Sequence, residues 1–172
     1  MSQWIPSEEE TFAQLGCLLL LTQQVEHVAS RLIGIVYPDG TPSWKELESL
    51  ERKTLGNLAR TLKERVDIHP TFEGLFEHFV EGRNLFVHRL NNQPWFDMRS
   101  EAGRDEIWKF LERYQTLLQE ILLVVTSAIF KHAEIAGMPE TKWHAELRRT
   151  GFLQEIKEYD FRSQVAFRGR KS

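Results

Sequence analysis

Arg83, Asn84 and His88 are the residues whose types and spacing best suit a chemical reaction. Histidine titrates near neutral pH, so His88 could take up or give a proton. Arginine stays charged and can hold a phosphate through two parallel hydrogen bonds, so Arg83 could stabilise a phosphorane-like transition state. Asn84 could orient His88 or hold a phosphate oxygen. These residue types suit RNA cleavage, because the 2′-hydroxyl of RNA can attack its own phosphorus without a metal or a protein nucleophile.

The spacing of these residues limits how they can meet. Asn84 and His88 are four residues apart, so on an α-helix they share a face and can hydrogen-bond. Arg83 lies five residues from His88, which is about 140° around a regular helix. We therefore expect one of three arrangements: Arg83 reaches around the helix, the helix is distorted near Gly82, or two copies of the helix face each other across a two-fold axis.

The run Arg83-Asn84-Leu85-Phe86-Val87-His88 resembles the signature of the HEPN superfamily, the higher eukaryotes and prokaryotes nucleotide-binding proteins. Thr54-Leu55-Gly56-Asn57-Leu58 is similar, less specifically, to a segment of some members. The resemblance covers roughly residues 8 to 136. It implies a helical bundle that is usually a homodimer, and in many members a metal-independent endoribonuclease that acts as a toxin or a defence effector.

The resemblance implies that Arg83, Asn84 and His88 are catalytic and that the products are a 2′,3′-cyclic phosphate and a 5′-hydroxyl. It implies no metal and no cofactor. Glu26, on the preceding part of the chain, is expected to fix Arg83, although a plain surface glutamate is an equal alternative. An antitoxin or regulatory protein is a further expected partner. Leu90 replaces a tyrosine that some HEPN toxins carry, so control by a nucleotidyltransferase acting on that tyrosine is not expected.

Basic residues near the motif are candidates for RNA binding. Arg89 directly follows His88, and Arg60 and Lys63 lie on a basic stretch that is equally typical of a solvated helix face. Two other functions stay open: a non-catalytic HEPN-like module that binds nucleotide, RNA or protein, and a helical scaffold whose motif only stabilises a dimer. The acidic residues just before the motif, which would repel phosphates, are Glu73, Glu77 and Glu81.

Four α-helices are predicted to position the motif. Capping boxes begin the first helix at Ser7 and Glu10 and the second at Ser43 and Glu46. The third begins near Pro70 and the fourth near Ser100. Apolar residues recur at spacings of three and four along each helix. The stripes are Leu18, Leu21, Val25, Val28, Leu32 and Ile35; Leu47, Leu50, Leu55, Leu58, Leu62 and Val66; Phe72, Leu75, Phe76, Phe79, Val80, Phe86, Val87 and Leu90; and Ile107, Leu111, Tyr114, Leu118, Ile121, Val125 and Ala128.

The predicted fold is therefore all-α: an up-and-down, HEPN-like four-helix bundle over residues 1–139, with a short C-terminal helical extension and basic tail over 140–172. Turn residues at 37–40, 91–94 and 137–139 end the helices. Residues 140–172 carry 8 basic and 5 acidic side chains, a net charge of +3. This tail is either a solvated terminus or a segment that contacts RNA or an acidic partner.

The amino-acid composition excludes several classes of protein and of binding site. The 172 residues include 22 Lys and Arg against 25 Asp and Glu, so binding of nucleic acid through net charge alone is not expected. A single cysteine excludes a disulfide framework and a thiolate-rich zinc site. The longest apolar runs are far shorter than the roughly 20 residues that span a bilayer. We therefore expect a cytoplasmic protein without a membrane partner.

Overall fold

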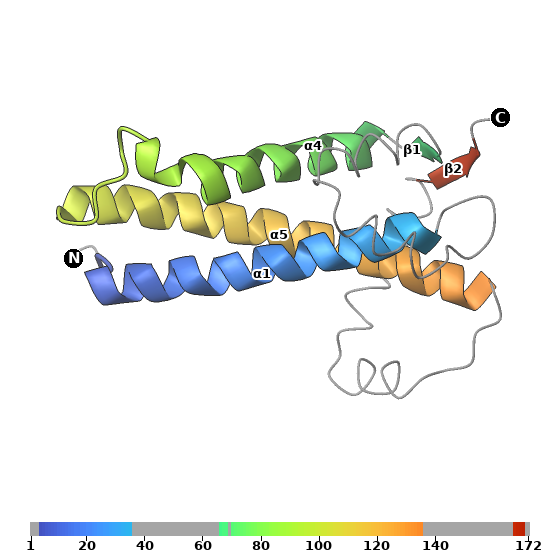
Figure 1. The fold of residues 1–172 in the computed structure, drawn as a ribbon, viewed down its shortest axis with the longest axis horizontal. Helices are drawn as coiled ribbons and strands as arrows, with labels where there is room; N and C mark the ends of the chain where they lie inside the picture. Colours follow the sequence, from blue (N-terminus) through green and yellow to red (C-terminus); the bar gives the residue numbers. More distant parts are fainter. Residues whose placement is uncertain (1–3, 36–65, 69, 136–166, 171–172) are drawn as a thin grey trace.

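The computed structural model describes residues 4–35, 66–68, 70–135 and 167–170, with side chains placed for residues 4–30 and 73–129. Three long helices dominate this part of the chain: α1 (Glu8–Ile35), α4 (Pro70–Asn84) and α5 (Glu101–Ile135) (Figure 1). α4 continues into a π-helical turn, Leu85–Arg89, and then a 3-10 turn, Leu90–Asn92. Strands β1 (Val66–Ile68) and β2 (Phe167–Arg170) form an antiparallel pair near the start of α4.

Apart from this short strand pair, the described part of the chain is helical, so the all-α prediction is confirmed at that level. The strands themselves were not expected from the sequence. Val66, placed by its spacing on the second predicted helix, lies in β1 and pairs with Arg170 of the basic tail. Most of the second predicted helix (43–66) and most of the C-terminal extension (140–172), including its boundary at residue 139, lie outside the described residues.

Figure 1 shows the directions in which the three described helices run. α1 and α5 run in the same direction, and α4 runs in the opposite direction (Figure 1). Side-chain contacts agree, since Arg104 at the start of α5 donates to the Pro6 carbonyl, and Tyr114 further along α5 meets Thr22. The three described helices thus alternate in direction along the chain, and the second helix of the predicted four-helix bundle lies outside the described residues. Hydrophobic periodicity sets which face of a helix is buried and says nothing about its direction.

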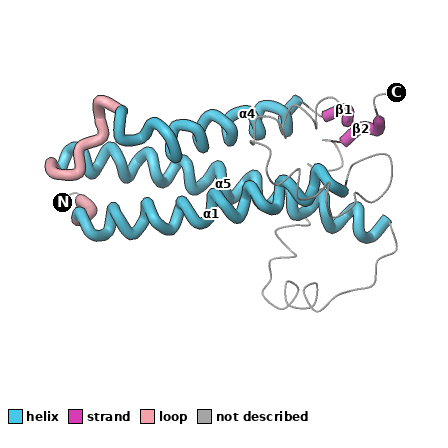
Figure 2. The backbone as a smooth tube through the Cα atoms, in the orientation of Figure 1, coloured by secondary structure: helices cyan, strands magenta, loops and turns pink. Residues whose placement is uncertain are grey.

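Both α1 and α5 begin with side-chain caps. At the start of α1, the Ser7 amide donates to a Glu10 carboxylate oxygen at 2.7 Å and the Glu10 amide donates to Ser7 Oγ at 3.1 Å, which confirms the first capping box. At the start of α5, the Gly103 amide donates to Ser100 Oγ at 3.1 Å. The loop before Ser100 closes the end of the molecule opposite to the strand pair (Figure 2). The capping box at Ser43 lies outside the described residues.

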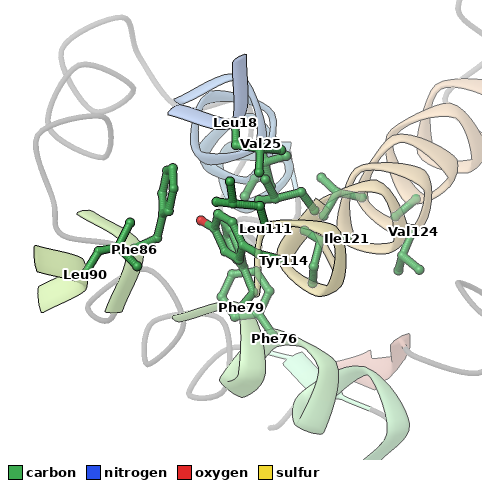
Figure 3. Packing of buried hydrophobic residues seen from close by; sticks show 14 of the residues in the cluster. Leu18, Val25, Phe76, Phe79, Phe86, Leu90, Leu111, Tyr114, Ile121 and Val124 are labelled. Carbon is green, nitrogen blue, oxygen red and sulfur yellow. The ribbon is translucent and has the colours of Figure 1, made fainter. Parts of the chain in front are cut away.

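The core lies where α5 packs against α1 and α4 (Figure 3). Every residue of the predicted α5 stripe is buried, and Ile107, Leu111, Leu118 and Ile121 have no exposed surface. α1 contributes its own stripe through Leu18 and Val25 and the neighbouring Ala29. Leu21 and Val28 of the predicted α1 stripe are half-buried, and the side chains of Leu32 and Ile35 lie outside the described residues. The residue period therefore identified the buried face of α5 in full and that of α1 in part.

α4 is less enclosed than its apolar composition predicts. Phe76 and Phe79 are buried against α5, but Glu77, His78 and Glu81 are exposed, so one face of α4 is open to solvent. Val87, counted among the apolar positions of this helix, is 38% exposed. Its position in the π-helical turn explains this, because the turn changes the phase of the residues that follow it.

Candidate functional site

The candidate site lies where α4 stops being a regular α-helix. Leu85–Arg89 form one π-helical turn, in which hydrogen bonds join residues five apart instead of four. Phe86 and Leu90 are buried on either side of His88 and anchor this turn, with the Phe86 ring centroid 4.8 Å from that of Tyr114. His88 is left exposed. Single π-helical turns inside α-helices occur frequently at functional sites.

The π-helical turn resolves the spacing problem posed by the sequence. On a regular helix Arg83 and His88 would point about 140° apart. Here the Nη1 atom of Arg83 lies 2.7 Å from the Nε2 atom of His88. Of the three expected arrangements, distortion of the helix brings them together, although it begins at Leu85 rather than at Gly82. The contact is complete within one chain.

Arg83 is the centre of the site and meets three acceptors. Its Nε donates to Glu26 Oε1 on α1 at 2.6 Å, which forms an ion pair between the two helices. Its Nη1 donates to Asn84 Oδ1 at 3.3 Å as well as contacting His88. Asn84 and His88, which share a helix face in the sequence pattern, thus meet through Arg83. Within the described residues, the Nη2 nitrogen of Arg83 makes no hydrogen bond.

The Arg83–His88 contact suits one form of the imidazole. A guanidinium has five N–H donors and no acceptor. The contact can be a hydrogen bond only in the neutral tautomer of His88 in which Nε2 carries its lone pair and the proton is on Nδ1. A protonated imidazole would turn an N–H toward the guanidinium, and the two groups would have to separate. The atom of His88 that can accept a proton is therefore the atom that Arg83 holds.

Tyr114 packs against the site through Phe86 and forms a hydrogen bond with Thr22. Its place in an apolar stripe did not predict this role. Its hydroxyl lies 2.9 Å from Thr22 Oγ1, and Thr22 donates to the Leu18 carbonyl at 2.7 Å. A Cβ added at Gly82 would lie 3.2 Å from the Tyr114 ring, so the glycine allows α4 to come close to α5 just before Arg83. The sequence feature that could have indicated this role is the residue type, because a buried tyrosine hydroxyl requires a polar partner.

Electrostatics at Tyr114 reflect this position. Burial is the largest cause that raises the pKa of Tyr114, to about 12, and the carboxylate of Glu26 raises it further. The hydrogen bond with Thr22 and the positive charge of Arg83 act in the opposite direction. Tyr114 is therefore a neutral hydroxyl at physiological pH, and the charges of both Arg83 and Glu26 act on its pKa.

The structure says less about the other residues that the sequence predicted for the site. Arg89 is exposed and follows His88 in the π-helical turn. Arg60 and Lys63 lie outside the described residues. Glu77 and Glu81 are exposed on α4 and Glu73 is half-buried. Among the described residues, the ion pair of Arg83 is with Glu26 and not with the neighbouring Glu81.

The loop after the site contributes packing. The Trp95 ring centroid lies 5.4 Å from that of Phe110, and Phe110 stacks on Tyr114 at 5.9 Å. Trp95 and Phe96 are half-buried and pack against the core. This placement makes Trp95 and Phe96 a hydrophobic plug at the end of the helices.

Comparisons with protein-family models, with curated proteins and with solved structures found no match to this chain. In the part of the chain that the structure describes, no three His, Cys, Asp or Glu side chains gather as metal ligands. None of the described helices is both long enough and apolar enough to cross a membrane.

Proposed function

We propose that this protein is a metal-independent endoribonuclease of the HEPN type, with Arg83, Asn84 and His88 as catalytic residues. The observation that carries the proposal is the 2.7 Å contact between Arg83 Nη1 and His88 Nε2 on an exposed turn. It joins a permanent cation, suited to a phosphate, with a neutral imidazole, suited to a proton. The proposal includes a HEPN-like four-helix bundle, a cytoplasmic location and a toxin or defence role under an antitoxin or regulatory protein.

In the proposed reaction a phosphodiester of RNA binds to Arg83 through its Nη1 and Nη2 nitrogens and displaces His88 from the guanidinium. His88 Nε2 then accepts the proton of the 2′-hydroxyl. The 2′-oxygen forms a bond to phosphorus, the bond from phosphorus to the 5′-oxygen breaks, and the 5′-oxygen takes up a proton from water. His88 returns its proton to the solvent after the products leave. The products are a 2′,3′-cyclic phosphate and a 5′-hydroxyl.

In this proposal Glu26 has a positioning role and Asn84 contacts the phosphate. Glu26 binds only the Nε side of Arg83, so the two terminal nitrogens stay directed toward the turn. Asn84 Oδ1 meets Nη1 at 3.3 Å and could turn its amide donor toward a phosphate oxygen. Arg89, Arg60 and Lys63 are proposed to bind the RNA backbone on either side of the cleaved bond.

A non-catalytic binding module is the second candidate, and one observation favours it. Glu26 neutralises Arg83, and the Arg83 side chain is only 23% exposed, so this contact holds α4 on α1 as a partly buried ion pair. Exposed acids on α4 would repel phosphate, so they weigh against RNA as the ligand in both candidates.

The test uses purified full-length protein, a mixed RNA pool and excess EDTA, with mapping of the new RNA ends. We expect the wild type to leave 2′,3′-cyclic phosphates and not to cut DNA, which lacks the 2′-hydroxyl. His88→Ala should abolish cleavage. His78→Ala is the matched control, because His78 is an exposed histidine on the same helix, and it should cleave normally. RNA binding without cleavage by the wild type would favour the binding module.

A further inference from the structure

Tyr114, on α5, contacts every element on which the candidate site depends. Its hydroxyl lies 2.9 Å from Thr22 Oγ1 on α1. Its ring lies so close to Gly82 on α4 that a Cβ added there would stand 3.2 Å away. The centroid of the same ring is 4.8 Å from that of Phe86 in the π-helical turn. One buried side chain thus touches α1, α4 and the turn.

The hydrogen bond between Tyr114 and Thr22 has a direction. The Thr22 hydroxyl has one proton, and it donates that proton to the Leu18 carbonyl at 2.7 Å. In the contact between the two hydroxyls, Tyr114 is therefore the donor and Thr22 Oγ1 is the acceptor. Both hydroxyls are buried, so each needs its partner within the protein. The Tyr114 hydroxyl thus attaches α5 to α1 at this turn.

The position of Thr22 on α1 connects this hydrogen bond to the site. Thr22 and Glu26 are four residues apart, so they share a face of α1 and are separated by about 6 Å along its axis. Glu26 binds Arg83, and Arg83 directly follows Gly82 on α4. Both members of the ion pair therefore lie next to a residue that Tyr114 contacts. Their charges also act on the pKa of Tyr114, as expected for a hydroxyl close to the pair.

We propose that Tyr114 is a positioning residue, whose hydrogen bond to Thr22 holds Glu26 where it keeps Arg83 directed toward His88. The ring contacts of Tyr114 hold α4 on α5, and its hydroxyl adds the attachment to α1. Without the hydroxyl, this turn of α1 can shift against α5, and Glu26 moves relative to Arg83. The predicted effect on RNA cleavage rests on the proposed function, whereas the predicted effect on the Arg83 side chain does not.

Another hydrogen bond between the same two helices provides a matched control. Gln14 Nε2 on α1 donates to Gln115 Oε1 on α5 at 2.8 Å. Gln14 lies about 18 Å from Glu26 along α1, too far to set the position of the ion pair. Gln14→Met removes this hydrogen bond and keeps the length of the side chain. A role of Tyr114 in stability alone would make Gln14→Met and Tyr114→Phe alike in their effect on the site.

NMR of the Arg83 side chain in full-length protein tests the inference without RNA. In the wild type, the proton on Arg83 Nε is donated to Glu26. Tyr114→Phe keeps the ring and removes only the hydroxyl, and it should speed the exchange of this proton with water by about tenfold. Gln14→Met should leave the exchange rate unchanged. Circular dichroism checks that each variant is folded. Unchanged exchange in Tyr114→Phe, or the same acceleration in Gln14→Met, would overturn the inference.

Substitutions at Thr22 test the same hydrogen bond from α1. Thr22→Val removes the acceptor and should reproduce the faster exchange at Arg83, whereas Thr22→Ser keeps the hydroxyl and should behave as the wild type. Because both residues act through one hydrogen bond, combining Tyr114→Phe with Thr22→Val should change the rate no more than the larger single effect. Additive effects, or a Thr22→Val protein with the wild-type rate, would overturn the inference.

Cleavage kinetics test the consequence for the proposed reaction. Tyr114→Phe should lower kcat by about tenfold and change KM by less than about twofold, because a displaced Arg83 still binds phosphate but stabilises the transition state less. Gln14→Met should leave both constants unchanged. Equal kcat in Tyr114→Phe and the wild type would overturn the positioning role and leave the ribonuclease proposal standing. Absence of cleavage by the wild type would overturn the ribonuclease proposal, and the Arg83 exchange rates would still decide the role of Tyr114.

Discussion

Along the seam between α1 and α5, buried residues recur every three or four positions, and both helices stay regular throughout. At the end of α4, the chain passes through a π-helical turn and a 3-10 turn within eight residues, Leu85–Asn92. Ile107, Leu111, Leu118 and Ile121 on the seam have no exposed surface, whereas the turn directs Val87 and His88 outward. The seam thus provides stability, and the irregular turn provides a place where Arg83 and His88 meet.

The largest expected effect tests the division between core and turn. Phe79, on the regular part of α4, has no exposed surface and packs against Phe76 and α5. Phe79→Ala should lower the free energy of unfolding by about 3–5 kcal/mol, because it leaves a cavity. Val87→Ala, in the turn, should change it by less than about 0.5 kcal/mol. Urea unfolding measures both, and similar losses would show that the turn belongs to the core.

Alkaline pH should lower the free energy of unfolding through the ionisation of Tyr114. The pKa of Tyr114 is raised to about 12 in the folded protein, so the folded state keeps its proton while the unfolded chain, with an ordinary tyrosine pKa near 10, loses it. Stability from this group is complete below pH 10 and falls as the pH rises toward 12, by roughly 2–3 kcal/mol. Tyr114→Phe should be less sensitive over this interval. Equal pH dependence in urea unfolding would contradict the assignment.

A smaller effect is expected at the ion pair that joins the two regions. Glu26→Gln keeps an oxygen acceptor for Arg83 Nε but removes the charge. Because both side chains are about one quarter exposed, at 23% and 27%, we expect a loss of about 1 kcal/mol in unfolding free energy. Lys109→Gln removes a cation that pairs with Asp105 and Glu106 on the surface of α5, and its effect should be smaller still. The reverse order would show that the Arg83–Glu26 pair adds little to helix packing.

The contrast between the regions also explains what the sequence could predict. The stripes of α1 and α5 and the Ser7–Glu10 capping box follow from local spacing, and the structure has them. The parallel course of α1 and α5 is a long-range feature of the fold, which no local pattern encodes. The strand pair joins Val66 to Arg170 across more than 100 residues, beyond the reach of any periodicity.

The sequence predicted which residues form the site but not how their side chains meet. Residue types, their spacing and the resemblance to the HEPN signature brought Arg83, Asn84 and His88 together as candidates, with Glu26 as their support. Regular helix geometry separates Arg83 from His88, and only the π-helical turn reverses this. That turn depends on tertiary packing of Phe86 and Leu90, which a single sequence does not display.

The central claim is that Arg83 holds the proton-accepting nitrogen of His88 until a phosphodiester takes its place. Nitrogen NMR of His88 at pH 8, above the ordinary histidine pKa near 6.5, measures this directly. Without ligand, we predict the neutral tautomer with the proton on Nδ1 and Nε2 accepting a hydrogen bond. Addition of a 2′-deoxy-substituted RNA that cannot be cleaved should change the Nε2 shift and leave His78 unchanged. A proton on Nε2 in the free protein, or a His88 signal indifferent to the phosphodiester, would contradict the account.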